Sequence, residues 1–237
     1  MMSNSFFNFK QFSISQDKSA FKVGTDGVIL GAYADVKNAT QILDIGSGTG
    51  LIAIMLAQRC EAEITAIEPD YESYIQTCEN VALCRWDKRI KIIHTNLQNF
   101  KHESRKFDLI VSNPPFFNDS LKNPDARKSA ARHNDSLSSA DLLEGASKLL
   151  DEDGRLQVIM PYIEGNILIA EASGYSLFCN SILKIKPSPT AEIRRLIMSF
   201  SRARTKAVES FLTIEHGKRH EFTEEYIVLT KDFYLKF

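Results

Sequence analysis

The stretch QILDIGSGTGLIAIMLAQRC, residues 41–60, decides the fold of this chain. It begins with a short apolar run that ends at Gly46, and after the glycines it continues with apolar residues at helical spacing. Glycines at positions 46, 48 and 50 allow positive φ angles and a close approach of a ligand to the backbone. A strand, a glycine loop and a helix in this order predict the first unit of a doubly wound α/β sheet.

Strand and helix patterns alternate after this unit. Short apolar or alternating runs predict strands at residues 41–46, 63–68, 89–94, 107–112 and 154–161. Helical spacing of apolar residues predicts helices at residues 51–60, 71–84, 138–150 and 163–173, with Gly154 closing the turn behind the helix at 138–150. Strands separated by helices imply right-handed crossovers, so we expect a Rossmann-like, mostly parallel sheet.

The C-terminal part of the chain has a different pattern. YSLFCNSILKIK (residues 175–186) and IRRLIMSFSR (193–202) are both strand-like, and the connection PSPTAE is too short for a crossover helix. These two strands should therefore form an antiparallel hairpin. The prediction is a seven-stranded α/β sheet, with residues 208–214 as one more edge strand and a last helix at 223–230.

Length and composition describe an ordinary globular protein. The 237 residues, 43% of them hydrophobic, predict a single domain with an N-terminal arm and helix (1–40) and a core (41–237). A net charge of -1 excludes a globally basic nucleic-acid coat but not a local basic patch. The 4 cysteines lack metal-like spacing, and no run resembles a signal peptide or a membrane span. We expect a cytoplasmic monomer without metal and without a membrane partner.

The glycine loop predicts a ligand that contains a nucleoside. Its G-x-G-x-G spacing differs from the dinucleotide fingerprint, and it lacks the lysine of a phosphate-binding loop. Glu68 ends the second predicted strand, where doubly wound folds place an acid on ribose hydroxyls. The helix N-terminus behind the loop can hold a carboxylate as readily as a phosphate. A plain turn is the alternative interpretation of the glycines alone.

The motif N-P-P-F, residues 113–116, follows the fourth predicted strand. Asn113 offers its side-chain oxygen and Pro114 its carbonyl oxygen as two acceptors for the hydrogens of a planar amine. Pro114 and Pro115 fix φ near −65°, which holds these acceptors in place before a substrate arrives. Phe116 could stack on a base, a contact worth roughly 1–3 kcal/mol. The alternative is a turn that merely ends the strand.

The combination D-x-G-x-G-x-G, a second-strand acid and N-P-P-F resembles the S-adenosylmethionine-dependent methyltransferases of the Rossmann-like class that act on amino groups. This resemblance implies that Asp44, Gly46, Gly48 and Gly50 surround the methionine end of the cofactor, and that Glu68 binds its ribose. The turn HTNLQNF would hold the adenine, with Asn96 and Leu97 as its binding residues. Many relatives have aspartate where this chain has Asn96, whose amide can still accept and donate.

The sequences at the two ends of the chain narrow the choice of substrate. FNFKQFSISQDKSAFKVGTDGVILGAYA, residues 7–34, resembles the N-terminal segment of the bacterial tRNA1(Val) adenine-37 N6-methyltransferases, and the ending FTEEYIVLTKDFYLKF resembles that family's ending. The resemblance implies S-adenosyl-L-methionine as cofactor, a valine tRNA as partner and the segment KVGTDGVIL, residues 22–30, as a cover of the cofactor. Thr25 and Asp26 belong to this cover, and either could cap a helix that runs to Tyr33. Phe116 replaces the tyrosine typical of these enzymes.

The sequence leaves two other substrate classes as alternatives. N-P-P-F also occurs in enzymes that methylate guanine N2 of ribosomal RNA, although those usually carry a second, duplicated domain. Protein-glutamine N5-methyltransferases share the motif as well, and the basic segments of this chain argue mildly against them. A binding module that has lost its chemistry is disfavoured by the intact glycine loop and by Asn113.

Basic residues gather in two segments where RNA could bind. The expected RNA-binding residues are Lys122, Arg127, Lys128 and Arg132 after N-P-P-F, and Arg194, Arg195, Arg202 and Arg204 in the C-terminal hairpin. A mobile surface loop and a solvated strand face are the alternatives. His216 and His220 have i,i+4 spacing but no third ligand, so we expect surface histidines.

Overall fold

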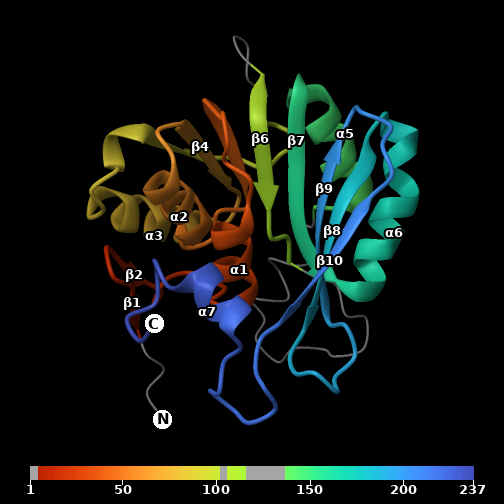
Figure 1. Cartoon of the computed structure of the whole chain (residues 1–237). Helices are drawn as coiled ribbons and strands as arrows, with labels where there is room; N and C mark the ends of the chain where they lie inside the picture. The colour runs from red at the N-terminus through yellow and green to blue at the C-terminus, as the bar shows by residue number, and fades with distance from the viewer. Residues whose placement is uncertain (1–4, 102–105, 116–136) are drawn as a thin grey trace.

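The computed structural model describes residues 5–101, 106–115 and 137–237 (Figure 1). In these residues the central sheet has 8 strands in the order β10-β8-β9-β7-β6-β3-β4-β5. A separate hairpin is formed by β1 (Phe6–Asn8) and β2 (Ser13–Ser15). The strands of the central sheet are β3 (Gln41–Ile45), β4 (Glu63–Glu68), β5 (Ile90–His94), β6 (Phe107–Ser112), β7 (Leu150–Pro161), β8 (Phe178–Lys186), β9 (Arg195–Ser201) and β10 (Val208–Thr213).

The strand directions agree with the sequence prediction. β3 pairs in parallel with β4 on one side and with β6 on the other, and β5 and β7 extend the parallel arrangement outward. β9 is antiparallel to both β7 and β8, which confirms the C-terminal hairpin. The additional edge strand is β10, which runs parallel to β8. The chain changes direction across the sheet at β3, where doubly wound folds bind their ligands.

Helices cover both faces of the sheet (Figure 1). One core cluster combines α1 (Thr25–Tyr33), α2 (Leu51–Arg59), residues of α3 (Tyr71–Ala82) and of α7 (Glu224–Thr230) with Ile42 and Val111. The other combines α5 (Ser139–Leu149) and α6 (Tyr162–Ala172) with Leu43 and Ile110. Neighbouring strand residues therefore serve opposite cores, as a sheet buried on both faces requires. Short 3-10 turns lie at Asp87–Arg89 and Ser173–Tyr175.

Side-chain caps mark the start of some helices, and the structure corrects two predictions made from the sequence. Ser138 caps α5 and forms a capping box with Asp141. α1 instead begins after Gly24 with no side-chain cap, so the prediction of a Thr25 or Asp26 cap is wrong. Gly154 does not close a turn but lies inside β7, where a Cβ atom would come within 2.7 Å of the Phe107 carbonyl oxygen.

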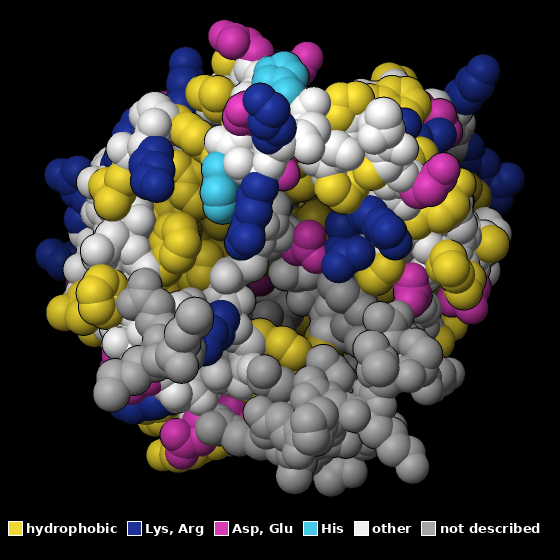
Figure 2. Space-filling model, turned by 90° about the horizontal axis from the view of Figure 1, so that it is seen from below, with side chains coloured by type: hydrophobic (Ala, Val, Ile, Leu, Met, Phe, Trp, Pro, Cys, Tyr) yellow, Lys and Arg dark blue, Asp and Glu magenta, His cyan; other side chains and the backbone are white. Residues whose placement is uncertain are grey.

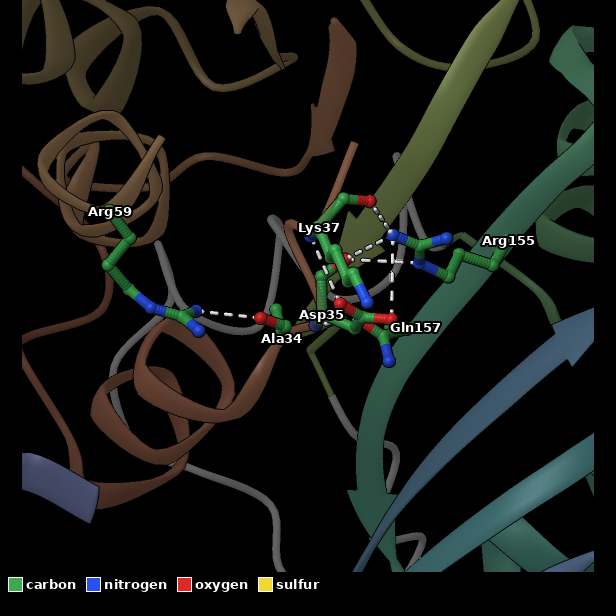
Figure 3. A network of polar contacts seen from close by, with 6 residues as sticks. All are labelled: Ala34, Asp35, Lys37, Arg59, Arg155 and Gln157. Carbon is green, nitrogen blue, oxygen red and sulfur yellow. Dashed lines mark hydrogen bonds and ion pairs between the residues drawn. The ribbon is translucent and has the colours of Figure 1, made fainter. Parts of the chain in front are cut away.

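We call the side of the sheet where β3 to β7 begin its amino end, and the side where they end its carboxyl end. At the amino end, polar contacts fasten the segment that follows α1 (Figure 3). Arg59 donates to the carbonyl oxygens of Gly31 and Ala34 at 2.9 and 2.7 Å. Arg155 donates to the carbonyl oxygen of Asp35 from two nitrogens, and the Gln157 side chain accepts from the Asp35 N–H at 2.8 Å. The C-terminal end of α1 is thus tied to both α2 and β7.

The N-terminal hairpin packs against the last residues of the chain. The rings of Phe9 and Tyr234 stack with centroids 5.9 Å apart. The Lys10 ammonium donates to the carbonyl oxygens of Lys231 and Phe237 at 2.7 and 2.5 Å. Residues from the two ends of the sequence that carry the family resemblance therefore form one aromatic cluster beside α1 and α7.

Candidate active site

A pocket of about 730 Å³ opens at the carboxyl end of the sheet. Figure 2 views the molecule from this end and shows a hollow near the middle of the face, with basic and acidic side chains close to it. The lining includes residues 20–27, 45–49, 67–70, 95–98 and 113–115. These segments follow β3, β4, β5 and β6 or precede α1, so the pocket lies where the crossover directions of the sheet reverse.

The glycine loop forms one wall of the pocket. Gly46 and Gly48 have φ angles of +75° and +60°, and a Cβ atom on either would meet no atom within 4 Å. Space above these glycines is therefore open to a ligand that approaches the backbone. Gly50 has another role, because it is the left-handed N-cap of α2 and a Cβ atom there would lie 3.0 Å from Thr77. Gly50 does not line the pocket.

Asp44 lies underneath this wall. Its side chain is 0% exposed, and neither carboxylate oxygen has a hydrogen-bond partner among the described residues. Burial, with a smaller contribution from the nearby charge of Glu68, raises the pKa of Asp44 to about 7. Asp44 is not among the residues that line the pocket. A buried carboxyl group with two unused acceptors suits a positively charged ligand close to the loop.

Glu68 joins the glycine loop to the end of β4. Its two oxygens accept from the N–H groups of Gly48 at 2.8 Å and of Asp70 at 3.0 Å. Burial raises the pKa of Glu68 to about 7, although these two N–H donors act in the opposite direction. The side chain also lines the pocket, so each carboxylate oxygen retains acceptor capacity toward a ligand hydroxyl.

Asn96 and Leu97 contribute the part of the pocket lining that follows β5. The Asn96 side-chain oxygen accepts from the Asn99 N–H at 2.9 Å and thereby fixes the turn that follows β5. The buried Leu97 side chain occupies the space that Gly145 of α5 leaves open, because a Cβ atom there would lie 2.6 Å from Leu97. Both residues line the pocket, as the sequence predicted for the adenine site.

Thr25 and Asp26 line the pocket from the first turn of α1. Asp26 also accepts a hydrogen bond from Nε of Arg195 at 2.7 Å, and both side chains are about one-third exposed or less. Two residues with separately predicted functions, cofactor binding and RNA binding, thus form one ion pair. Because Arg195 begins β9, this pair ties the N-terminal end of α1 to the C-terminal hairpin.

The N-P-P segment continues directly from β6. Asn113, Pro114 and Pro115 line the pocket, and Asn113 lies next to the start of α1, with its amide nitrogen 3.8 Å from the position of a Cβ atom on Gly27. The Ser112 hydroxyl donates to the Ile45 carbonyl oxygen at 3.0 Å and so holds the ends of β6 and β3 together. The predicted acceptors therefore lie in the same pocket as the glycine loop. Phe116 lies outside the described residues.

The predicted RNA-binding residues do not form one surface. Arg194 and Arg195 lie at the carboxyl end, because Arg195 pairs with Pro161 at the end of β7. β9 is antiparallel, so Arg202 and Arg204 lie past its other end, at the amino end of the sheet. There Arg202 donates to the Ser147 carbonyl oxygen at 2.6 Å, and the Arg204 guanidinium lies 4.6 Å from the Phe178 ring centroid. Four further predictions, Lys122, Arg127, Lys128 and Arg132, fall outside the described residues.

Several lining residues were not predicted from the sequence. They are neighbours of the predicted ones: Ser47, Thr49, Pro69, Asp70 and Gln98. Each stands within three positions of a motif residue, so proximity to the motifs was the available signal. Leu137, which also lines the pocket, directly precedes the N-cap of α5 and has no such signal.

Comparison with known proteins gives the class and then the family. The chain matches the family model described as "Methyltransferase small domain" over residues 22–165. A crystal structure of a predicted O-methyltransferase from Agrobacterium tumefaciens superposes with a TM-score of 0.66 at 21% identity, covering 88% of this chain and 96% of that one. A ribosomal protein L11 methylase from Lactobacillus delbrueckii subsp. bulgaricus gives a TM-score of 0.51 at 19% identity over 75% and 78%. Fold and pocket thus define a Rossmann-like methyltransferase.

Curated relatives are similar along almost the whole chain. A protein of Trichodesmium erythraeum is 46% identical over 98% of both chains. A Bacteroides fragilis protein is 44% identical over 99% of this chain and 100% of its own, and a Flavobacterium psychrophilum protein is 45% identical over 97% and 99%. All three bear the name tRNA1(Val) (adenine(37)-N6)-methyltransferase. The chain belongs to the family of the tRNA1(Val) (adenine(37)-N6)-methyltransferases.

S-adenosyl-L-methionine is the cofactor of this class, and the pocket fits it. The open space above Gly46 and Gly48 and the buried, unpartnered carboxyl group of Asp44 both suit a cationic ligand that lies against the loop. The described residues include no group of three or more potential metal ligands. No helix among those same residues has the length and apolarity needed to cross a membrane.

Proposed function

We propose that this protein transfers a methyl group from S-adenosyl-L-methionine to N6 of adenine 37 in the anticodon loop of tRNA1(Val). The observation that carries the proposal is that Asn113 and Pro114 line the same pocket as Gly46, Gly48 and Glu68. Near-complete similarity to relatives that bear this name supports the choice of substrate. An anticodon-loop base is unpaired or nearly so, which keeps the cost of extruding it low.

Each residue has a defined role in this proposal. Glu68 binds the ribose hydroxyls, Asn96 and Leu97 hold the adenine, and Thr25 and Asp26 close the pocket above. The cofactor supplies a methyl group activated by its sulfonium charge. A second group, Asn113 and Pro114, acts on the substrate.

The amine nitrogen of adenine is a poor nucleophile because its lone pair is delocalised into the ring. The side-chain oxygen of Asn113 and the carbonyl oxygen of Pro114 accept its two hydrogens and favour a more pyramidal nitrogen. The two prolines hold both acceptors before the base arrives, which lowers the entropic cost of alignment. The carbon–sulfur bond breaks as the carbon–nitrogen bond forms, and the surplus proton leaves to solvent. Stacking on Phe116 remains a prediction.

Nucleoside analysis of the product tests the reaction. The protein is incubated with methyl-labelled cofactor and an unmodified tRNA1(Val) transcript, and the RNA is digested to nucleosides. We expect the label in N6-methyladenosine and none when guanine replaces adenine 37 of the transcript. Label in 2-methylguanosine would favour a guanine-N2 methyltransferase, and label only in added release factor would favour a protein-glutamine methyltransferase. Either result would contradict the proposal.

The proposal includes the form in which the protein works. We infer that residues 1–237 act as one domain, as a monomer and in the cytoplasm, where the tRNA is modified. The packing of the N-terminal hairpin against Tyr234 and Phe237 supports the inference of one domain. Sedimentation equilibrium of the protein with and without tRNA checks the monomer, and a dimer mass would contradict it.

A further inference from the structure

Residues at the termini of three neighbouring strands form a continuous row at the carboxyl end of the sheet, where β7 and β8 end and the antiparallel β9 begins. The Tyr162 N–H, directly after β7, donates to the Arg194 carbonyl oxygen at 3.2 Å. The Arg194 N–H, directly before β9, donates to the Ile185 carbonyl oxygen at 2.9 Å. Lys186 ends β8 next to Ile185, and its carbonyl oxygen accepts from the Ile214 N–H at 2.9 Å. Backbone pairing therefore fixes the order Tyr162, Arg194, Lys186 along this end of the sheet.

This row presents an aromatic ring and two cations to solvent. Tyr162 is 43% exposed and Ile163, beside it in the first turn of α6, is 70% exposed. Arg194 is exposed and Lys186 is half-buried. The acids nearby in the chain are Glu164 and Glu192. Because part of Tyr162 is open to solvent, an unpaired base could lie against its ring.

The row is continuous with the pocket. β6 and β7 are adjacent parallel strands, and Ser112, which precedes Asn113, pairs with Val158 of β7. Neighbouring strands lie about 4.8 Å apart, and residues rise about 3.3 Å each along a strand. β7 continues past Val158 to Pro161, so Tyr162 extends roughly 13 Å beyond the level of Ser112. A strand of nucleic acid with one base at Asn113 would therefore pass over Tyr162.

We propose that Tyr162 stacks on a base that flanks the target nucleotide, and that Arg194 and Lys186 contact phosphates of the same single-stranded RNA segment. This inference rests on the proposed function, since it assumes an RNA substrate. A ring next to cations is the combination that binds unpaired bases, because every base has a face to stack and a phosphate to neutralise. These contacts would hold the anticodon loop of the substrate. The paired bases of a stem are poorly accessible to side chains and so contribute little to recognition.

Replacement of Tyr162 tests the stacking contact. We expect Tyr162→Ala to raise the Kd for an anticodon stem-loop RNA about tenfold, a change within the range of one stacked base. Tyr162→Phe keeps the ring and should bind within twofold of the wild type. Cofactor affinity should be unchanged in both variants, because Tyr162 does not line the pocket. An RNA Kd for Tyr162→Ala within twofold of the wild type would overturn the proposal.

The cations are tested by the salt dependence of binding, with Arg85 as the matched control. Arg194→Ala removes one phosphate contact, so the slope of log K against log salt should fall by about one. Arg85 is also an exposed arginine but lies between α3 and the start of β5, at the amino end of the sheet, so Arg85→Ala should leave the slope unchanged. Equal slopes for Arg194→Ala and the wild type would contradict the row as an RNA contact.

Failure of this inference can be separated from failure of the proposed function. If the wild-type protein does not methylate the tRNA1(Val) transcript, the proposed function fails and the inference fails with it. If the wild type methylates the transcript and Tyr162→Ala does so with an unchanged KM for RNA, the inference fails alone. A raised KM for RNA with an unchanged KM for the cofactor supports the inference.

Discussion

The two ends of the sheet are built from similar residues but differ in how fully their polar groups are satisfied. At the amino end, Arg59 and Arg155 donate to backbone carbonyl oxygens (Figure 3). Asp108 accepts there from two N–H groups and a hydroxyl group at the start of β3. At the carboxyl end, Asp44 is buried without a partner and left-handed glycines surround open space. The difference indicates that one end stabilises the fold while the other retains binding capacity for a ligand.

The largest effect on activity should come from replacing Asn113, the side-chain acceptor in the pocket at the carboxyl end. We expect Asn113→Ala to lower kcat by about 10²–10³-fold, the usual cost of losing one oriented transition-state partner. Cofactor affinity should change little, because the glycine loop and Glu68 remain. Single-turnover methylation and calorimetric titration with the cofactor measure the two quantities. Full activity of this variant would contradict the assigned role of Asn113.

A substitution at the amino end should give the opposite profile. Arg155→Ala removes donors to the carbonyl oxygens of Asp35 and Lys37, which are 2.8 Å from Nη2. We expect the free energy of unfolding to fall by about 1 kcal/mol, because two carbonyl oxygens at the surface exchange a charged donor for water. The kcat of the remaining folded protein should equal that of the wild type. Urea unfolding and initial rates test this, and a fall in kcat without a loss of stability would contradict the division between the two ends.

The glycines of the loop should separate ligand binding from folding. Gly48→Ala places a side chain at φ +60° in the open space of the pocket, and we expect about tenfold weaker cofactor binding. Gly50→Ala meets Thr77 at 3.0 Å and should mainly destabilise the protein. Gly174→Ala is the control, since a Cβ atom there meets nothing within 4 Å and no positive φ constrains it. Equal effects of the Gly48 and Gly174 substitutions on binding would contradict this role.

The last test is the pH dependence that Asp44 and Glu68 confer. Burial raises the pKa of both carboxyl groups to about 7, above the usual value near 4, so between these values the folded state binds more protons than the unfolded state. The free energy of unfolding of the cofactor-free protein should therefore fall as pH rises through that range.

The affinity for the cofactor should also depend on the protonation of Asp44 and Glu68, but it should increase as pH rises. A cationic ligand favours ionised carboxylates, so its Kd should fall by up to about tenfold per pH unit below pH 7 and level off above it. Calorimetric titrations between pH 5.5 and 8 measure this trend, and Asp44→Asn should weaken it. A Kd that does not change over this range would contradict the role of these carboxyl groups.

Features encoded by neighbouring residues could be predicted from the sequence. Glu68 ends a strand, and the glycine loop and Asn113 each directly follow one, so strand order alone brings them to one pocket. Contacts between distant residues could not be predicted, such as the pair of Asp26 and Arg195, which are 169 positions apart. Each of these two residues carried a separate prediction, and only the fold shows that they contact each other.

Strand direction explains why the predicted RNA-binding arginines do not lie together in the structure. Arg194 and Arg204 stand close together in the sequence, but β9 runs from one end of the sheet to the other between them. Composition of a segment therefore says little about which face its charges reach. Asp44 illustrates the same limit of sequence-based prediction. The motif predicted that Asp44 would surround the cofactor, but in the structure it is buried and does not line the pocket.

The attachment of α1 at both of its ends has a consequence for dynamics. Residues Gly27 to Ala32 are buried, Arg59 binds the C-terminal end of the helix, and Asp26 binds Arg195 at the other. A helix held in this way opens only with the rest of the core, so its amide hydrogens should exchange as slowly as those of β3 although it precedes the sheet in the chain. Because α1 is held in place, we expect the cofactor to enter and leave past this helix without displacing it.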